Sequence, residues 1–263
     1  MSGTLWSRLE EVSRRALLSG ALEPIATRST FLEDEGVRFV VRIVERIERK
    51  KASQEAQEKS GRNPFLPYDK ELFVADVSTN HVALLNKFNV MENHLLVVTR
   101  AFEEQESLLT PEDFEAMRVV LEDFDSLFFY NSAAAAGASQ RHKHLQFVPV
   151  PIGEGPERCP MEFLLAGGRQ ALPFPCRFQS APPTRERYLE ALAAFGRRSD
   201  PGAYNLLATR DWMLFVPRRQ GSFESISVNG LGFAGAFLVK DDEELARLLL
   251  VGPMNVLREV ALR

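Results

Sequence analysis

The chain has 263 residues, 45% of them hydrophobic and 26% charged, and its formal net charge at pH 7 is −4. This length and composition suffice for a sizeable hydrophobic core, and we expect a single compact unit over residues 1–263. A mildly acidic chain is a poor candidate for general binding to nucleic acid or to a membrane surface, so neither partner is expected. No apolar run reaches about 18 residues and the N-terminus has no apolar signal-peptide region, which predicts a cytoplasmic protein.

Residues 1–150 are predicted to form an N-terminal half that mixes helices and strands. The stretch Thr110-Pro111-Glu112-Asp113 combines an N-cap threonine, a proline and two acids in one turn, which is typical of a helix start. Other segments show the spacing of helices, the β-branched residues of strands or the polarity of a surface loop. The predicted elements are a helix from Thr4 to Gly20, strands at 39–47, 71–77 and 93–100, a mobile loop at 50–64, and a helix from Thr110.

Residues 151–183 are rich in proline and glycine and are predicted to connect this half to a C-terminal half at 184–263. Strands that are neighbours in sequence, with helices at intervals, favour an α+β fold with a mainly antiparallel β-sheet flanked by helices. The predicted C-terminal elements are a helix capped by Thr184, two strands around a turn at 205–218, one or two strands at 225–239, and a closing helix near Asp242.

Two of the four histidines lie in one short segment, SQRHKHLQFVPVP, at 139–151. In a strand, alternate side chains point to opposite faces, so His142, His144 and Gln146 should share one face. Lys143 should then project from the other face and is not expected to join the histidines.

Two histidines on one face of a strand have three ordinary explanations. They can be structural and hydrogen-bonded near the core, they can bind zinc, or one can be a nucleophile that the other orients. The zinc interpretation is weakened because the third residue in line is an amide, although His81 or His94 could supply a ligand in space. We therefore predict no metal ligands.

The segment before this strand, YNSAAAAGASQ at 130–140, has only small or polar side chains after Tyr130. Small residues let a ligand approach the backbone, where N–H groups and the Ser139 hydroxyl can donate to an anion. A tightly packed turn would use the same residues, and the pattern leaves both interpretations open.

The stretch GASQRHKHLQ at 137–146 resembles the diadenosine tetraphosphate phosphorylases, also called ATP adenylyltransferases, of the histidine-triad and galactose-1-phosphate uridylyltransferase superfamily. Four more stretches resemble this family in the same order, and the resemblance covers roughly residues 37–240. They are NPFLPYD (63–69), LLNKFNVMENHLLVVTRAFEEQ (84–105), YNLLATRDWMLFVPR (204–218) and ISVNGLGFAG (226–235). The resemblance implies a histidine-triad-like fold. It also implies a nucleotidyltransferase that converts diadenosine tetraphosphate (Ap4A) and phosphate to ATP and ADP through a covalent AMP–histidine intermediate.

The resemblance makes His144, the second histidine, the nucleophile. An imidazole with an unperturbed pKa near 6.5 is largely neutral at pH 7, and a nucleotidyl-imidazole can pass AMP to an acceptor. His142 would hold the other ring nitrogen or the local backbone and so fix the tautomer. The hydrolase branch of the superfamily has a third histidine in place of Gln146. An amide can bind phosphate oxygens but cannot exchange a proton at neutral pH, which favours a transferase.

The resemblance implies substrate contacts in both halves, so that the C-terminal half completes the nucleotide pocket. These residues are Lys51 (or Lys50), Asn86, Lys87, Asn131, Gly137, Ala138, Ser139, Gln140 and Gln146, with Asn229, Gly230, Leu231 and Lys240. The expected partners are Ap4A, ATP, ADP and phosphate. A divalent cation, Mg²⁺, is expected with the substrate, no organic cofactor is expected, and the chain should be a monomer or a weak homodimer.

Three positions depart from the family pattern. Alanine begins the run 133–136 where glycine is expected, Arg141 stands where proline is expected, and Ala236 stands where some relatives have a larger side chain. The first two could stiffen the loop and the third could widen the pocket, which leaves the preferred substrate open. The alternatives are a nucleotide-binding sensor without turnover, a transferase that uses adenylyl sulfate or another dinucleoside polyphosphate, and a zinc-stabilised structural protein.

Overall fold

The computed structural model describes residues 4–45, 63–166, 172–197 and 200–262. The predicted loop at 50–64 falls almost wholly outside these ranges, and so do Lys50 and Lys51. No helix in the described ranges has both the length and the apolar character needed to cross a membrane.

Six α-helices are found in the described ranges, and three of them begin at the threonines expected to cap them. Thr4 and Thr184 each accept a hydrogen bond from the backbone three residues on, and Thr110 forms a reciprocal capping box with Asp113. These predictions are confirmed because each depends on chemistry within one turn of the chain. The helices are α1 (Leu5–Ser19), α3 (Pro111–Asp123), α4 (Glu162–Ala166), α5 (Arg185–Ala194), α6 (Asp242–Val251) and α7 (Pro253–Val260).

The main sheet has eight strands, and every neighbouring pair in it is antiparallel. This confirms the predicted α+β fold with a mainly antiparallel sheet. The pairing of β6 with β9 joins the first half of the chain to the second. In spatial order the strands are β3 (Phe73–Asp76), β4 (His81–Leu85), β5 (Leu95–Thr99), β7 (His144–Pro149), β6 (Ser126–Asn131), β9 (Tyr204–Ala208), β10 (Met213–Pro217) and β8 (Arg177–Gln179).

A second sheet pairs a segment near the start of the sequence with one near its end. The hairpin of β1 (Thr27–Asp34) and β2 (Val37–Val44) is extended by β13 (Ala236–Val239), which pairs parallel with β2. A two-stranded ribbon, β11 (Ser222–Phe223) and β12 (Ile226–Ser227), precedes β13. Strands β1, β4 and β6 and helix α7 are additions that the sequence patterns did not predict.

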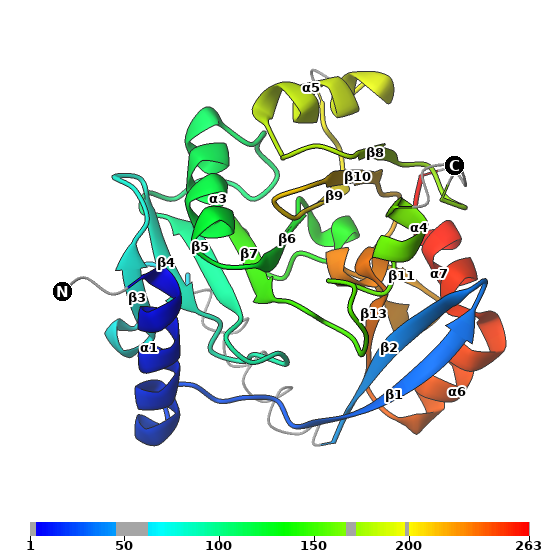
Figure 1. The fold of residues 1–263 in the computed structure, drawn as a ribbon, viewed down its shortest axis with the longest axis horizontal. Helices are drawn as coiled ribbons and strands as arrows, with labels where there is room; N and C mark the ends of the chain where they lie inside the picture. The colour runs from blue at the N-terminus through cyan, green and yellow to red at the C-terminus, as the bar shows by residue number, and fades with distance from the viewer. Residues whose placement is uncertain (1–3, 46–62, 167–171, 198–199, 263) are drawn as a thin grey trace.

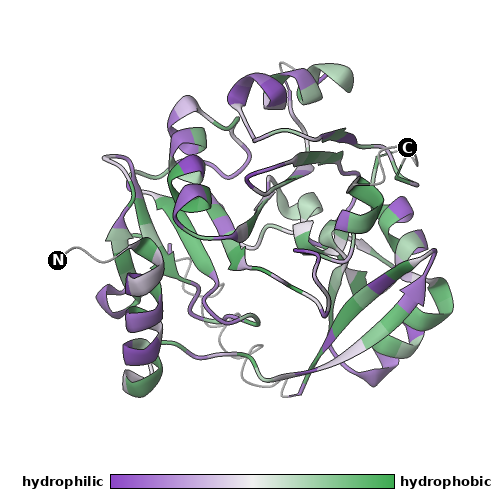
Figure 2. Ribbon diagram, viewed as in Figure 1, coloured by the Kyte–Doolittle hydropathy of each residue, from purple (hydrophilic) through white to green (hydrophobic). Residues whose placement is uncertain are grey.

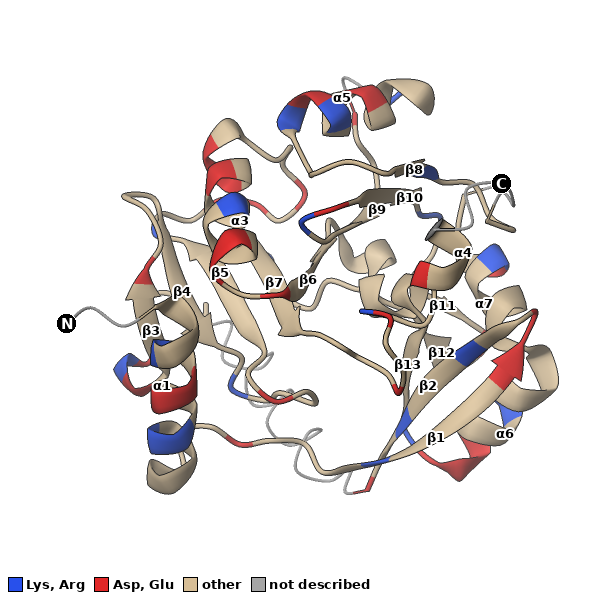
Figure 3. Ribbon diagram, in the orientation of Figure 1, with Lys and Arg blue, Asp and Glu red and all other residues tan. Residues whose placement is uncertain are grey.

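Two large cores cover opposite faces of the main sheet, and a smaller third cluster packs Phe65 against β4 and β5 (Figures 1 and 2). Along β6, Phe128 and Tyr130 enter the first core, which lies under α1, α3 and α5, while Leu127 and Phe129 enter the second. The second core is closed by β2, β13, α6 and α7. Outward from these cores, the helices α1, α3, α5 and α6 carry both signs of charge (Figure 3).

Residues 151–183, predicted to be a connector, contain α4 and the edge strand β8 in their described part. Five of their described side chains are buried in the second core: Ile152, Cys159, Met161, Leu165 and Phe174. The segment therefore packs as part of the molecule and also links its two halves.

Candidate active site

The two histidines of the HxHxQ stretch lie at the centre of the main sheet. β7, which begins at His144, is flanked by β5 and β6, so the backbone of this stretch is held from both sides. Lys143 projects into the opposite face, where its Nζ lies 2.6 Å from Glu103 Oε2 and 3.2 Å from Asp113 Oδ2. The expected separation of Lys143 from the histidines is therefore found.

The ring of His144 is held in one tautomer. Its Nδ1 donates a hydrogen bond to the carbonyl oxygen of His142 at 2.8 Å, so Nε2 carries the lone pair. No described residue hydrogen-bonds to Nε2, and this atom keeps some exposure to solvent. Burial lowers the pKa of His144, which is 4% exposed, to about 4, so the ring is neutral at pH 7.

His142 acts on His144 through its backbone carbonyl and not through its ring. The His142 ring is itself fixed: its Nε2 donates to the Thr99 carbonyl oxygen at 2.8 Å, and its Nδ1 accepts from Asn63 Nδ2 at 2.9 Å. Burial lowers the pKa of His142 and outweighs the acceptors at Thr99 and Ala101, which raise it. Phe65 packs against both rings, with centroids 5.6 Å apart in each case.

Gln146 lies beside His94, which the sequence analysis considered only as a zinc ligand. His94 Nδ1 accepts a hydrogen bond from Asn86 Nδ2 at 3.2 Å, so its proton is on Nε2, which is buried and has no hydrogen-bond partner among the described residues. Burial lowers the pKa of His94 to about 4, Gln146 raises it in part, and His144 lowers it further. Asn86, expected to contact substrate, thus orients a third imidazole next to His144 and Gln146.

The small-residue loop (residues 131–140) forms the tight turn that was one of its two interpretations, and its binding of an anion stays a prediction. It contains a tight turn, Ala134–Ala136, in which the N–H groups of Gly137 and Ala138 donate to Ala134 and Ala133. The turn therefore uses these two N–H groups, so they are not available to donate to an anion in this conformation. The N–H groups of Ser139 and Gln140 have no partner among the described residues.

Gly137 brings this loop against the C-terminal half. Its φ is +93°, and a Cβ at this position would lie 2.7 Å from the Cβ of Asn229. Both the backbone conformation and the close approach require glycine. Asn131 adds a second link, because its Oδ1 accepts from Gly230 N and from Asn205 Nδ2, each at 2.9 Å. Residues expected to share a ligand are thus in direct contact.

Gln105 connects the loop to the nucleophile strand and is a second residue that sequence reasoning missed. Its Oε1 accepts from His144 N at 2.9 Å, and its Nε2 donates to the Asn131 carbonyl oxygen at 2.8 Å. It is 2% exposed. A lone buried amide near a predicted strand end is a weak signal, because its partners are distant in sequence.

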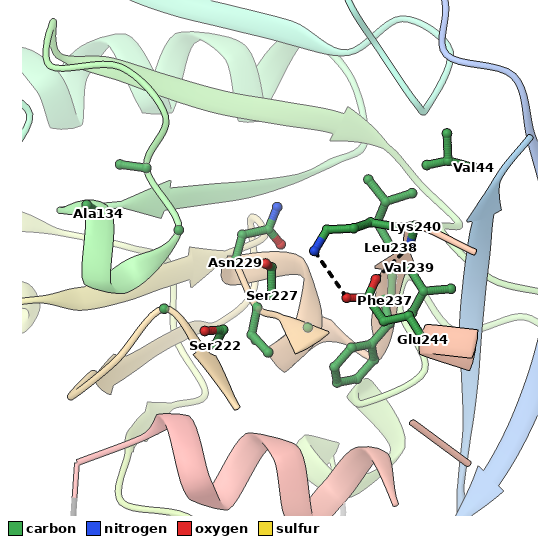
Figure 4. A pocket seen from close by; sticks show the side chains of 16 residues that line it. Val44, Ala134, Ser222, Ser227, Asn229, Phe237, Leu238, Val239, Lys240 and Glu244 are labelled. Carbon is green, nitrogen blue, oxygen red and sulfur yellow. Dashed lines mark hydrogen bonds and ion pairs between the residues drawn. The ribbon is translucent and has the colours of Figure 1, made fainter. Parts of the chain in front are cut away.

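A pocket of about 530 Å³ lies on the C-terminal side of the small-residue loop (Figure 4). Ala236 is in its wall, as expected for a residue that affects pocket width. Lys240 and Glu244 face each other at its edge, with Nζ and Oε1 3.4 Å apart. The lining residues among the predicted contacts are Gly137, Ala138, Asn229 and Lys240. The predicted site residues therefore fall into two groups, the histidine cluster and this pocket, with the loop and Gln105 between them.

The remaining predicted contacts are less informative. Lys87 is 41% exposed and pairs with Glu23 at 3.3 Å, and Leu231 is half-buried. Lys51 lies outside the described residues. His81, considered as a zinc ligand, lies 2.9 Å from Asp113 instead. In the part of the chain that the structure describes, no three His, Cys, Asp or Glu side chains gather in a way that could hold a metal ion.

Comparisons with known proteins agree across the whole chain. Residues 1–167 match the model of the Ap4A phosphorylase N-terminal domain, and residues 170–263 match that of the ATP adenylyltransferase C-terminal domain. Diadenosine 5',5'''-P1,P4-tetraphosphate phosphorylase 2 of Saccharomyces cerevisiae is 30% identical over 238 residues, which is 71% of each chain. Protein APA1 of the same yeast is 26% identical over 92% of this chain and 88% of its own.

Solved structures show the same fold. The crystal structure of yeast Ap4A phosphorylase Apa2 in complex with Ap4A superposes with a TM-score of 0.81, at 24% identity and over 99% of this chain and 98% of that one. The complex of Apa2 with AMP gives 0.79 over the same shares. The two family models together span nearly every residue, and the chain belongs to the family of Ap4A phosphorylases and ATP adenylyltransferases.

Proposed function

We propose that this protein is an Ap4A phosphorylase, which converts Ap4A and phosphate to ATP and ADP by way of AMP bound covalently to His144. Family membership supports the reaction. The observation that carries the mechanism is the hydrogen bond from His144 Nδ1 to the His142 carbonyl oxygen, because it leaves the Nε2 lone pair available.

In the first step, the Nε2 lone pair attacks the α-phosphorus of Ap4A. The bond from that phosphorus to the bridging oxygen breaks, and ATP leaves with the electron pair. The carbonyl oxygen of His142 accepts the hydrogen bond from Nδ1–H and so stabilises the positive charge that develops on the imidazole. The proton stays on Nδ1 throughout. In the second step an oxygen of orthophosphate attacks the same phosphorus, the P–N bond breaks, and ADP leaves the neutral ring.

Gln146 supports transfer to phosphate over transfer to water. Its amide can hydrogen-bond to phosphate oxygens, but it cannot act as a general base for water at neutral pH. We assign the phosphate and nucleoside contacts to the small-residue loop and to Asn229, Gly230, Leu231 and Lys240. Asn86, Lys87 and Lys51 remain predicted contacts.

We further propose that Mg²⁺ enters as part of the substrate, bound to the phosphate chain, where it offsets the charge of the phosphates. A titration of activity with Mg²⁺ at fixed Ap4A tests this. One chain supplies both groups of site residues, so we propose a monomer or a weak homodimer as the active form. Light scattering at assay concentrations checks that assignment.

Product analysis from Ap4A at varied phosphate tests the function. We expect ATP and ADP in equal amounts, with turnover that requires phosphate, and labelled AMP trapped on the protein when phosphate is withheld. ATP and AMP formed equally fast without phosphate would identify a hydrolase, and tight nucleotide binding without any product would identify a sensor. Adenylyl sulfate and dinucleotides of other chain lengths, assayed in parallel, test the donor preference that Ala236 leaves open.

Two substitutions place the chemistry on His144. His144→Ala should lose turnover by about 10³-fold or more and should not label with AMP, while it retains a cooperative unfolding transition. His144→Gly should recover part of the activity when imidazole is added. Unchanged labelling of His144→Ala would move the nucleophile elsewhere.

A further inference from the structure

Arg218, directly after β10, is a buried cation beneath the pocket. It is 1% exposed, and no described carboxylate pairs with it. Its guanidinium also lies over the ring of Phe233, 5.2 Å from the centroid. Its acceptors are all neutral oxygens: Asn205 Oδ1 at 2.5 Å and the carbonyls of Gln220 at 2.8 Å, Val228 at 3.0 Å, Val260 at 3.2 Å and Ala136 at 3.5 Å.

A buried charge without a counter-ion is unfavourable, and a neutral side chain could cross-link the same carbonyls at lower cost. Burial lowers the pKa of Arg218 to about 9, which has the direction expected when no carboxylate compensates the charge. An anion bound close by would supply the missing compensation. Val228, whose carbonyl Arg218 holds, lines the pocket, so the charge lies directly behind the pocket wall.

The carbonyls that Arg218 holds also fix the direction of two N–H groups. In a trans peptide the C=O and the N–H point in opposite directions. Nη2 of Arg218 draws the Gln220 and Val228 carbonyls toward itself, so the N–H groups of Gly221 and Asn229 point away from it. Gly221 and Asn229 both line the pocket, and neither N–H has a partner among the described residues.

We propose that the N–H groups of Gly221 and Asn229 form a phosphate-binding subsite in the pocket. Arg218 orients these two groups and places a positive charge behind them. Lys240 lines the same pocket and supplies a second positive charge, although it is paired there with Glu244 at 3.4 Å (Figure 4). The subsite takes a phosphate group, which is either orthophosphate or a phosphate of the departing nucleotide. That identification rests on the proposed function, whereas the existence of the anion site does not.

Binding of ligands with different charge separates an electrostatic role from a structural one. We compare ATP, AMP and adenosine by calorimetry on the wild-type protein, Arg218→Met and Arg218→Lys. Arg218→Met should weaken ATP binding by about tenfold or more and adenosine by less than about twofold, while Arg218→Lys, which keeps the charge, stays near wild type. Arg219→Met is the matched control, because it removes an arginine that is paired with Glu259 and should leave all three affinities unchanged.

Equal weakening of all three ligands in Arg218→Met, or no weakening of ATP, would overturn the proposal. A titration of the ¹⁵N-labelled wild-type protein decides the matter even if Arg218→Met does not fold. The amide signals of Gly221 and Asn229 should shift with orthophosphate if the acceptor binds there, or with ATP alone if the departing chain does. Saturation with both ligands without a shift of these two signals would refute the subsite. Because this experiment measures binding and not turnover, a nucleotide-binding sensor without catalytic activity would also show the shift, so the result does not depend on the proposed function.

Discussion

The reactivity of His144 depends on how its ring is held as much as on its pKa. The His142 carbonyl fixes the Nδ1 proton, and burial keeps the ring neutral. His94 and His142 are also buried, and the pKa of each is lowered. The three rings therefore sit together without mutual charge repulsion, and the lone pair on Nε2 of His144 does not have to be generated by a separate base.

These pKa shifts predict that the reactivity of His144 falls only at a pH far below the usual pKa of histidine. Because the pKa of His144 is lowered to about 4, its neutral form persists as the pH falls. From pH 7 to pH 5.5 the neutral fraction of an imidazole with a pKa of 6.5 would fall about eightfold, whereas that of an imidazole with a pKa of 4 would fall by about 3%. The burst of ATP from Ap4A without phosphate should therefore change little over this range, and a limb centred near pH 6.5 would contradict the structure.

Gln146 should decide which acceptor removes AMP from His144. Gln146→His places a group that can accept a proton from water beside the intermediate, so the ratio of hydrolysis to phosphorolysis should rise by about tenfold or more. The measurement is AMP against ADP formed from Ap4A at fixed phosphate. Gln146→Asn is the control, because a shorter amide should slow both reactions without changing their ratio. An unchanged ratio in Gln146→His would mean that the amide does not control the acceptor.

At the scale of single elements, β7 separates two polar systems of different kinds. One face carries His144 and Gln146, and the other anchors Lys143 between Glu103 and Asp113. Burial raises the pKa of Asp113, but His81 and Lys143 outweigh it and leave that pKa lowered. Asp113 also closes the capping box of α3. The ion cluster thus ties the start of the nucleophile strand to a helix.

Removing Lys143 should therefore destabilise the fold much more than removing a neighbouring exposed charge. Lys143→Met leaves Asp113 buried without one of its two side-chain partners, which should lower the free energy of unfolding by about 3–5 kcal/mol. Arg141→Met is the matched control: Arg141 is 82% exposed and pairs with Glu104, so its loss should cost less than about 1 kcal/mol. Urea unfolding of both variants measures the difference, and similar midpoints would show that the cluster does not anchor β7.

Elements whose signal is local could be predicted, and those defined by distant partners could not. Thr110 and Thr184 predict the starts of their helices because a cap acts within one turn of the chain. β6 was missed because it is buried on both faces and shows no alternation. In the site, the HxHxQ alternation indicated three side chains on one face. Gln105 and Arg218 are single polar residues that each have acceptors far away in sequence, such as Asn131 for Gln105 and Ala136 for Arg218.

At the scale of the whole molecule, the two cores share the strands that separate them. β6 comes from the first half of the chain and β9 from the second, and each contributes side chains to both cores. The parallel pair of β2 and β13 ties the halves together again at the second sheet. Neither core can lose its structure without exposing one face of the shared sheet, so we expect the whole chain to unfold as one unit.

The two tryptophans make this expectation testable, because each reports on a different core. Trp6 packs against the first core beside Phe124, and Trp212 is buried in the second, where its Nε1 donates to Glu162 at 2.8 Å. In Trp212→Phe the fluorescence follows the first core alone, and in Trp6→Phe it follows the second. For each variant the fluorescence transition in urea should coincide with the transition of its own far-UV circular dichroism, which monitors the whole chain. Fluorescence and dichroism midpoints that separate within one variant would show that one core melts first and that the shared sheet does not couple them.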